Sequence, residues 1–442
     1  MRSPVKTPTL LPTDPTERAL FCCKAAARHE ERGHYARAVE SLDPFWDGPG
    51  SEFKPGRLTT EAHATLLLRA GSLTGWLGSQ RQFAGWQEQA KDLLSESAGL
   101  FARIGFMERY AEALRHMGIC YWREGPFEKA RLIFQQALDI TGGQTDDWLS
   151  LKLNDALVEY SEGKYQDCLD SHAKLASTIE GRNDSLKGRF HNGRGIALNR
   201  LGRTGLAIVE LRAAADHFRR SGHERFQIAS ENNLSNLFIL TKRFDEAHSS
   251  MDRAEALAEK LGDKAHLAQA KDSRALAWLA QKNYVDAEQA ATLSVGILEK
   301  GDEHALLVES LVTQARALSG LERRSAALGT YLRAYELAAD RVGGGRAARV
   351  VLEALSELAG EACLTGHVTI EDAKRVFEEG IIRKALKECD GKSKAAAMRL
   401  GLIPQTLSWI LQSRHPDLRP NPKRKRRRVS IVKRSDKKQR KS

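Results

Sequence analysis

Long apolar runs are missing from this 442-residue chain. No stretch reaches the roughly 18 apolar residues that a membrane-spanning helix needs. The N-terminal segment MRSPVKTPTLLPTDPTE lacks the apolar centre of a signal peptide. Proline is scarce, at 12 residues, whereas Leu and Ala are plentiful, and hydrophobic residues make up 41% of the chain. We therefore expect a helix-rich cytoplasmic protein with a substantial core and no membrane partner.

Signatures of catalysis and metal binding are absent as well. The six cysteines are scattered without a CxxC pair, so we interpret them as small buried residues in a reducing compartment. The 13 histidines form no HExxH motif or ligand cluster, and no GxSxG elbow occurs. Gly391-Lys392-Ser393 resembles the end of a phosphate-binding loop, but Leu386 stands where its first glycine must be. The sequence predicts no enzyme, no cofactor and no metal site; an enzyme with an unrecognised site is a rival for which no motif argues.

An internal period of about forty residues organises most of the chain. A small residue recurs as the first buried position of a second helix, at Ala38, Ala90, Ala130, Cys168, Ala207, Ala247, Ala287 and Ala327. Another small residue usually stands twelve positions earlier, as Gly118 does before Ala130. Two amphipathic helices approach closely only where side chains are small, so each unit is predicted to be an antiparallel helix pair. The interval between Ala38 and Ala90 is longer because it contains an insertion, GSQRQFAGW.

These units resemble tetratricopeptide repeats. The segment ALRHMGICYWREGPFEKARLIFQQAL matches well, with Gly118, Tyr121, Ala130, Phe134 and Ala137 at the family's signature places. The usual period of the family is about 34 residues, so the helices here are expected to be longer by about a turn and a half in total. The resemblance implies an all-α fold, with a solenoid of about eight helix pairs over residues 18–340. Residues 1–17 are predicted to be disordered.

In tetratricopeptide proteins the first helices line a concave groove that holds peptides or partner domains. The resemblance places eight side chains of this chain toward such a groove: Arg115, Trp122, Arg189, Asn192, Asn199, Asn232, Asn236 and Arg316. Asn is unfavourable inside a helix, so these amides require a reason. They would either grip a partner's backbone, with the arginines meeting acidic groups, or satisfy hydrogen bonds between repeats. Asn232 and Asn236, four apart on one face, are the stronger candidates for partner binding.

A second pattern begins after the glycine run at 343–345. Residues 341–365 are expected to form a joint with a capping helix from Arg346 to Leu364. Thr369 would then cap a helix that reaches about Cys389. The apolar side of this helix would carry Ile370, Ala373, Val376, Phe377, Ile381, Ala385 and Leu386.

A short helix, a glycine turn and a further helix follow. Ser393 would cap the helix Lys394 to Leu400, Gly401 would end it, and Pro404 suits the first turn of a helix reaching about Gln412. This segment resembles the Fis-type helix-turn-helix domain of bacterial regulators. The family pattern is found in Gly391, Ala396-Ala397, Leu400-Gly401, Thr406-Leu407 and Leu411. The resemblance implies a three-helix DNA-reading domain over residues 366–415.

DNA contacts would lie around the last of these helices. The resemblance places near the DNA groove Lys392, Lys394, Pro404, Gln405, Thr406, Ser408 and Trp409, and Arg414 lies beyond the helix. The family usually has Asn where Lys392 stands, and basic residues where this chain has Pro404, Ser408, Trp409 and Ile410. Gln405 can pair with adenine, whereas Trp409 could instead be a dimer or partner contact. A three-helix cap without DNA binding is the alternative.

Basic charge is confined to the C-terminal end. Residues 419–442 hold thirteen Lys and Arg against one acid, Asp436, and carry the whole net charge of +12. Residues 416–442 are predicted to be a disordered arm that binds phosphates with steep salt dependence and little sequence information. Its densest part is Lys423, Arg424, Lys425, Arg426, Arg427 and Arg428. The string PKRKRRRV also resembles a nuclear import signal, but the bacterial-looking domain beside it favours the DNA arm.

These patterns predict a DNA-binding transcriptional regulator or nucleoid-associated protein in a bacterial cytoplasm. Its solenoid would bind a protein or peptide partner that controls the helix-turn-helix domain. Fis-type domains commonly dimerise through their first long helix, so the resemblance implies a homodimer through residues 370–386. The alternative is an interaction scaffold whose tail binds nucleic acid nonspecifically.

Overall fold

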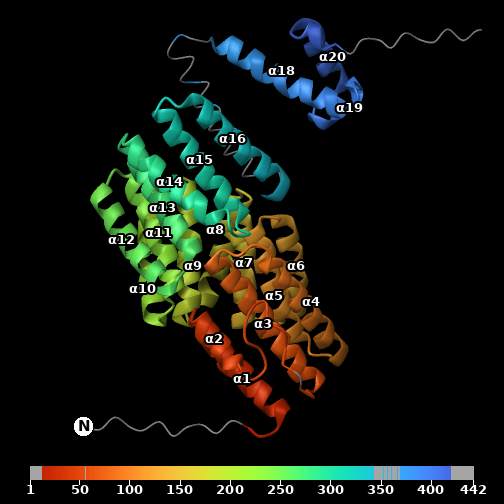
Figure 1. Cartoon of the computed structure of the whole chain (residues 1–442), viewed down its shortest axis with the longest axis vertical. Helices are drawn as coiled ribbons and strands as arrows, with labels where there is room; N and C mark the ends of the chain where they lie inside the picture. Colours follow the sequence, from red (N-terminus) through yellow and green to blue (C-terminus); the bar gives the residue numbers. More distant parts are fainter. Residues whose placement is uncertain are drawn as a thin grey trace, which may run out of the picture. The chain divides into compact units, whose positions relative to one another are not determined.

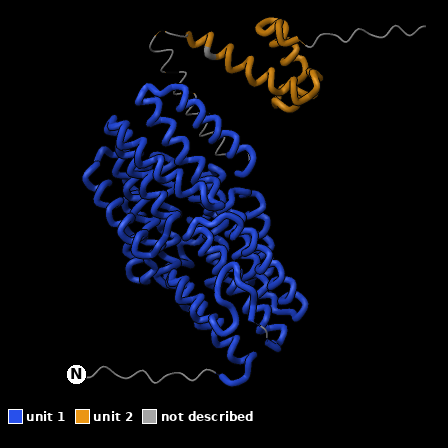
Figure 2. Tube along the Cα trace, viewed as in Figure 1, with its two compact units in different colours: residues 1–355 blue, residues 356–442 orange. Residues whose placement is uncertain are grey.

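The computed structural model describes residues 12–54, 56–342, 352, 356, 360, 366 and 369–419 (Figure 1). Within these ranges the secondary structure is helical apart from one antiparallel bridge between Trp46 and Phe53, which confirms the all-α prediction. The chain divides into two compact units, residues 1–355 and 356–442 (Figure 2). Among the described helices, none combines the length and the apolar character that crossing a bilayer requires. The expected capping helix and basic tail fall almost entirely outside the described residues.

The described part of the first unit consists of eight consecutive helix pairs. They are α1 (Pro15–Glu30) with α2 (Tyr35–Leu42), α3 (Thr60–Arg81) with α4 (Trp86–Ile104), α5 (Met107–Glu124) with α6 (Phe127–Ile140), α7 (Asp146–Ser161) with α8 (Tyr165–Ile179), α9 (Asp184–Arg200) with α10 (Thr204–Ser221), α11 (Glu224–Leu240) with α12 (Phe244–Leu261), α13 (Lys264–Ala280) with α14 (Tyr284–Leu298), and α15 (His304–Gly320) with α16 (Arg324–Leu337). A π-helical turn, Ala338–Val342, follows α16. Each pair corresponds to one predicted repeat.

Small residues lie at the crossing points inside the pairs, as the repeat pattern predicts. All eight small residues of the forty-residue period are fully buried: Ala38, Ala90, Ala130, Cys168, Ala207, Ala247, Ala287 and Ala327. The crossings leave no spare space, because a Cβ atom on Gly195 of α9 would lie 2.6 Å from Cγ of Leu211 on α10. This steric requirement fixes the register of each pair and gives a tetratricopeptide-like solenoid.

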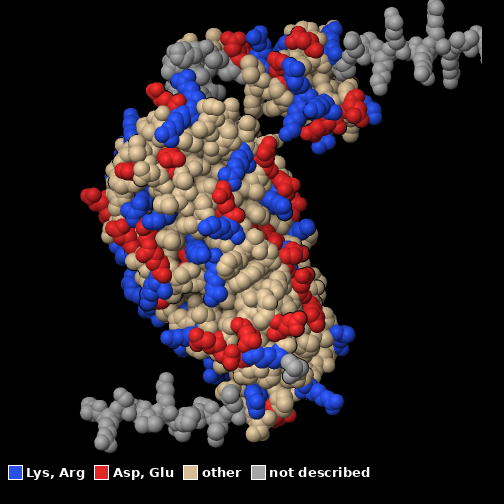
Figure 3. Space-filling view, viewed as in Figure 1, with Lys and Arg blue, Asp and Glu red and all other residues tan. Residues whose placement is uncertain are grey.

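The first helices of successive pairs touch one another along the series α5, α7, α9, α11, α13 and α15. No comparable contact joins successive second helices in the part of the unit that the structure describes. The array therefore curves with its first helices inside. We call the surface formed by α5, α7, α9, α11, α13 and α15 the inner face. Basic and acidic side chains are interspersed over the view in Figure 3, as expected from the zero net charge of residues 1–418.

Helix α3 is buried on nearly all sides, from Ala62 to Ser79. It contacts α1, α2, α4 and α5, its neighbours in sequence, and also the distant helix α13. A helix surrounded in this way belongs to the interior of a fold. The beginning of the array therefore lies against its seventh pair.

The second unit contains α18 (Ile370–Glu388), α19 (Ser393–Arg399), α20 (Pro404–Ser413) and a 3-10 turn, Pro416–Leu418. Thr369 caps α18 as predicted, since its hydroxyl accepts a hydrogen bond from the backbone N–H of Asp372 at 3.0 Å. Gly401 has φ +66° in the turn between α19 and α20, and Pro404 stands in the first turn of α20. One cap was predicted wrongly: Lys392 and not Ser393 holds the N-cap position of α19.

The predicted apolar side of α18 is buried only at its C-terminal end. Ile382, Ala385 and Leu386 pack against α19 and α20. Four residues of the predicted side remain exposed, Ile370 by 64%, Val376 by 65%, Phe377 by 51% and Ile381 by 40%. The physical reason is length, because α18 is longer than α19 and α20 and its first turns extend past the core that these helices form.

Candidate functional site

Two of the tryptophan and asparagine side chains expected in the groove join neighbouring repeats. Nε1 of Trp122 on α5 donates a hydrogen bond to Oγ of Ser161 on α7 at 2.9 Å. Oδ1 of Asn192 on α9 accepts a hydrogen bond from Nδ2 of Asn233 on α11 at 3.0 Å. These contacts are the inter-repeat hydrogen bonds that were one of the two interpretations of the sequence.

Three asparagines of the same set keep buried amide atoms without a hydrogen-bond partner. Asn232 on α11 is 4% exposed, and neither its Oδ1 nor its Nδ2 is paired. Oδ1 of Asn199 on α9 and Oδ1 of Asn236 on α11 are likewise buried and unpaired. An unpaired buried polar group costs roughly 1–3 kcal/mol. Hydrogen bonds between repeats therefore do not explain why asparagine occupies these three positions.

Two arginines of the inner face lie near each other, and one of them, Arg189, has no carboxylate among its hydrogen-bond partners. Burial and the positive charge of Arg115 on α5 lower the pKa of Arg189 on α9 to about 10. Arg189 donates only to uncharged oxygens, those of Ser150 at 3.2 Å and Oδ1 of Asn154 at 2.6 Å, both on α7. Nδ2 of Asn154 and Nε of Arg115 are buried without acceptors. This end of the inner face offers positive charge and unused donors.

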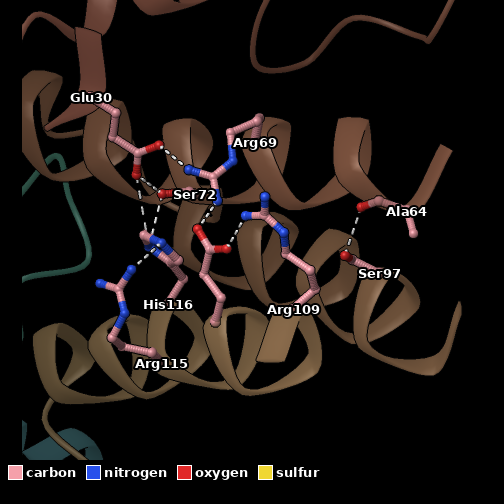
Figure 4. Close-up of polar contacts among 9 residues, drawn as sticks. Glu30, Ala64, Arg69, Ser72, Ser97, Arg109, Arg115 and His116 are labelled. Carbon is pink, nitrogen blue, oxygen red and sulfur yellow. Dashed lines mark hydrogen bonds and ion pairs between the residues drawn. The ribbon is translucent and has the colours of Figure 1, made fainter. Parts of the chain in front are cut away.

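Arg115 borders a buried network that joins α1, α3 and α5 (Figure 4). Arg69 on α3 pairs with Glu30 on α1 at 3.0 Å and with Glu112 on α5. Arg109 on α5 also pairs with Glu112, at 2.7 Å. Three guanidinium groups thus meet two carboxylates, which leaves an excess of positive charge beside the inner face.

Ser72, His116 and Glu30 meet in this network without the geometry of a hydrolytic triad. Oγ of Ser72 lies 2.8 Å from Nδ1 of His116 and donates to Glu30. Glu30 approaches the same ring nitrogen, at 3.9 Å, whereas a triad uses opposite nitrogens. Burial lowers the pKa of His116 well below its ordinary value and raises the pKa of Glu30. Nowhere in the described ranges do three His, Cys, Asp or Glu side chains gather as a metal ion would require.

An acid that the sequence analysis did not single out lies on α13. Burial, reinforced by the negative charge of Glu309 on α15, raises the pKa of Asp272 to about 7, although hydrogen bonds with the side chains of Thr313 and Ser310 and the charge of Arg316 act in the opposite direction. Oδ1 of Asp272 has no hydrogen-bond partner. Asp272 stands forty residues after Asn232, so the repeat period could have identified it. The arginine pair and this acid give the inner face opposite charges at different places along the array.

The side chains expected to contact DNA surround α19 and α20. Lys392, Lys394, Gln405, Ser408 and Trp409 are exposed, and Thr406 is half-buried. The core beneath them contains the predicted Ala396, Ala397, Leu407 and Leu411, with Leu400 packed against it. Helix α20 carries no charged residue along its length.

Arg414, expected to contact phosphate, is engaged inside the second unit. Its guanidinium lies 5.2 Å from the ring centre of Trp409, and its Nη1 lies 3.2 Å from a carboxylate oxygen of Glu378 on α18. His415, 2% exposed, contacts the same carboxylate at 3.0 Å. The charge of Arg414 is thus partly compensated. The six basic residues from Lys423 to Arg428 lie outside the described residues.

No protein-family model and no curated protein matches this chain, but solved structures share its fold. The crystal structure of a Rap protein complexed with competence and sporulation factor is 13% identical, with a TM-score of 0.52 over 73% of this chain and 98% of that one. The apo form of the quorum sensor NprR from B. thuringiensis is 12% identical, with a TM-score of 0.50 over 74% of this chain and 89% of that one. At these identities the likeness shows the fold, a tetratricopeptide-like solenoid.

Proposed function

We propose that the protein is a DNA-binding transcriptional regulator whose solenoid holds a protein or peptide partner. The partner half rests on one observation above all, the two buried and unpaired amide atoms of Asn232. An extended backbone offers the N–H and C=O groups that such an amide would pair with. A Rap protein of similar fold has been solved with competence and sporulation factor bound, and NprR is a quorum sensor, which supports a partner of this kind.

The charged side chains of the inner face indicate which chemical groups the partner carries. Arg115 and Arg189 have donors to spare and would bind a carboxylate. Asp272 would bind an ammonium or guanidinium group, which would also stabilise its ionised form. We therefore favour a short peptide segment with groups of opposite charge.

Retention of peptides by the full-length chain tests the partner half. A random hexapeptide library passed over the immobilised protein should leave bound peptides enriched in acidic groups, read by mass spectrometry. Arg115→Gln combined with Arg189→Gln should abolish that enrichment. A wild-type chain that retains no peptide at all would contradict this half of the proposal for peptides of that length.

The DNA half rests on α19, the turn at Gly401 and α20, followed in the sequence by the basic tail. The tail would supply phosphate affinity, while Gln405 and Thr406 would contact base edges. Exposed Phe377 and Ile381 on α18 support a homodimer. A dimer would offer two copies of α20 to successive major grooves. Partner occupancy would alter the curvature of the solenoid or the dimer geometry and so present or mask α20.

Gel shifts with a panel of duplex sequences at physiological salt test the DNA half. The wild-type chain should prefer some sequences, and Gln405→Ala combined with Thr406→Ala should erase the preference. Truncation after Arg419 should lower the affinity for every sequence and flatten its salt dependence. Equal wild-type binding to all duplexes would contradict a regulator.

Two features of the second unit favour an alternative, a protein-interaction scaffold whose tail binds nucleic acid nonspecifically. Helix α20 lacks charged residues. The charge of Arg414, which would otherwise be available to a DNA phosphate, is paired with the carboxylate of Glu378. A scaffold would retain peptides in the first experiment and show no sequence preference in the second.

A further inference from the structure

The solenoid closes on itself through the insertion that interrupts its repeat period. Helix α3 touches α13, and α5 touches α15. The closing segments are residues 79–87, which include most of the insertion, and residues 300–303, the turn between α14 and α15. We call this the closure contact. It joins groups that are distant in the sequence, such as Gly85 and Asp302, which are 217 residues apart.

Asp302 caps a helix that belongs to another repeat. Its carboxylate accepts hydrogen bonds from the backbone N–H of Gly85 at 3.0 Å and of Gln87 at 3.2 Å. Helix α4 has no capping side chain of its own, so Asp302 supplies the cap and a favourable charge at the helix N-terminus. The N–H of Ala84 donates to the carbonyl of Lys300 at 3.0 Å. Closure therefore satisfies backbone donors that would otherwise lack a protein partner.

Gly301 allows the two segments to approach. A Cβ atom at this position would lie 3.0 Å from Cα of Gln82 and 2.8 Å from its Cδ. Gln82 is 1% exposed, so its side chain has little room to move away. The absence of a side chain at Gly301 is thus required by the contact and not by a local turn.

Beside this contact, Trp76 of α3 lies among residues of distant pairs. The guanidinium groups of Arg123 on α5 and Arg225 on α11 lie 4.0 and 5.0 Å from its ring centre. Tyr35 of α2 stacks on it at 5.1 Å. Arg225 pairs with Asp263, the N-cap residue of α13, at 2.7 Å. These side chains are deeply buried except for that of Trp76, which is partly buried.

Ser79 links this cluster to the closure contact. Its hydroxyl accepts a hydrogen bond from Arg225 at 2.8 Å and donates one to Glu303. A buried charge that loses its partner strongly destabilises the fold. Separating the two sides of this cluster is therefore unfavourable, and the cluster stabilises the closed array. A connected set of polar contacts therefore holds the beginning of the array against its seventh pair.

We propose that the insertion Gly78–Trp86 is a latch that controls access to the inner face. In the closed array, in which the inner-face helices α5 and α15 touch, Asn232 is 4% exposed and its amide is unpaired. An open array would expose this amide to water or a partner. Closure and exposure of the inner face would then be competing states of the same chain. The consequence for a partner rests on the function proposed above: a partner would bind only the open fraction, and its apparent affinity would rise as the latch is weakened.

Thiol labelling in the full chain tests the latch without any partner. Asn232→Cys provides the reporter, and the chain lacking this substitution gives the background of the native cysteines. Adding Gly301→Ala or Asp302→Ala should raise the rate of maleimide labelling by roughly fivefold or more. Hydrogen exchange at the amides of Ala84, Gly85 and Gln87 should accelerate in the same variants, because these amides donate across the contact.

Gly296→Ala is the matched control, since a Cβ there meets nothing within 4 Å. It should change neither readout, and circular dichroism should show that all variants stay helical. Faster amide exchange with an unchanged labelling rate would show that opening the closure contact does not expose the inner face. No change in either measurement would show that the insertion is not a latch. Failure of the library to yield a peptide would leave these two readouts unaffected, so the latch and the partner proposal fail separately.

Discussion

A Cβ atom on Gly118 would lie 2.7 Å from Cδ1 of Phe134, inside the crossing of α5 and α6. Phe134 is 1% exposed and packed in the core of the first repeats, so it cannot move aside without opening the pair. Gly118→Ala should therefore lower the free energy of unfolding by about 1–3 kcal/mol, the usual cost of overpacking. Urea unfolding followed by circular dichroism would show the change as a lower midpoint.

Gly99→Ala on α4 separates this steric effect from helix propensity. A Cβ at Gly99 meets nothing within 4 Å, and alanine favours helix over glycine by about 0.5–1 kcal/mol. Its midpoint should stay the same or rise. Equal losses of stability in the two variants would show that the crossing is not tight.

The repeat register was predictable because helix crossings impose a local rule. Only Gly, Ala and other small residues fit where two helices meet, so positions such as Ala130 and Ala207 recur at a fixed spacing. Closure of the array follows no such rule. The insertion interrupts the period visibly, but its hydrogen bonds to Lys300 and Asp302 depend on curvature accumulated over six pairs.

The polar residues of the inner face were predictable as a set but not one by one. Asn192 and Asn232 look alike in the sequence, yet Asn192 is paired because Asn233 of the next repeat reaches it. Asn232 has no such neighbour. Apolar periodicity likewise identified one side of α18, but not that Phe377 extends past the core and stays exposed.

Asp272 makes the stability of the solenoid depend on pH. Its pKa is raised from 3.8 to about 7, so the folded protein holds a proton that the unfolded chain releases in this range. The stabilising contribution is therefore complete below pH 4 and is lost as pH rises through 7. Asp272→Asn should remove this loss and be more stable than wild type at pH 8 by more than about 1 kcal/mol, since one pKa unit corresponds to about 1.4 kcal/mol.

Urea midpoints of both chains at pH 5 and pH 8 measure this effect. Asp216→Asn, at an exposed position on α10, is the control and should follow wild type at both pH values. If the difference between Asp272→Asn and wild type were the same at pH 5 and pH 8, titration of Asp272 would be excluded as its cause.

Exposed apolar residues of α18 predict self-association of the second unit. Phe377→Glu combined with Ile381→Glu should convert a dimer into a monomer, because both side chains are exposed and a dimer through α18 would bury them. Light scattering coupled to size exclusion measures the mass. Leu132→Glu on α6, at a residue 70% exposed in the array, should leave the mass unchanged. A wild-type chain that is monomeric at micromolar concentration would refute the dimer.

Substitution by leucine should change the free energy of unfolding in opposite directions at Asn232 and at Asn192. Asn232→Leu removes two buried unpaired groups and should raise the free energy of unfolding by about 1–3 kcal/mol. Asn192→Leu leaves Nδ2 of Asn233 without its acceptor and should lower it by a similar amount. Urea unfolding of the two variants in the absence of peptide measures both.

Whether Asn232→Leu raises or lowers the free energy of unfolding distinguishes two reasons for an asparagine at this position. A polar group that destabilises the free protein is explained if it is needed for binding, since function is commonly kept at the expense of stability. Asn232→Leu should then gain stability and lose peptide retention together. A loss of stability would instead mean that the amide is already satisfied in the free protein, and the inner face would no longer require a partner.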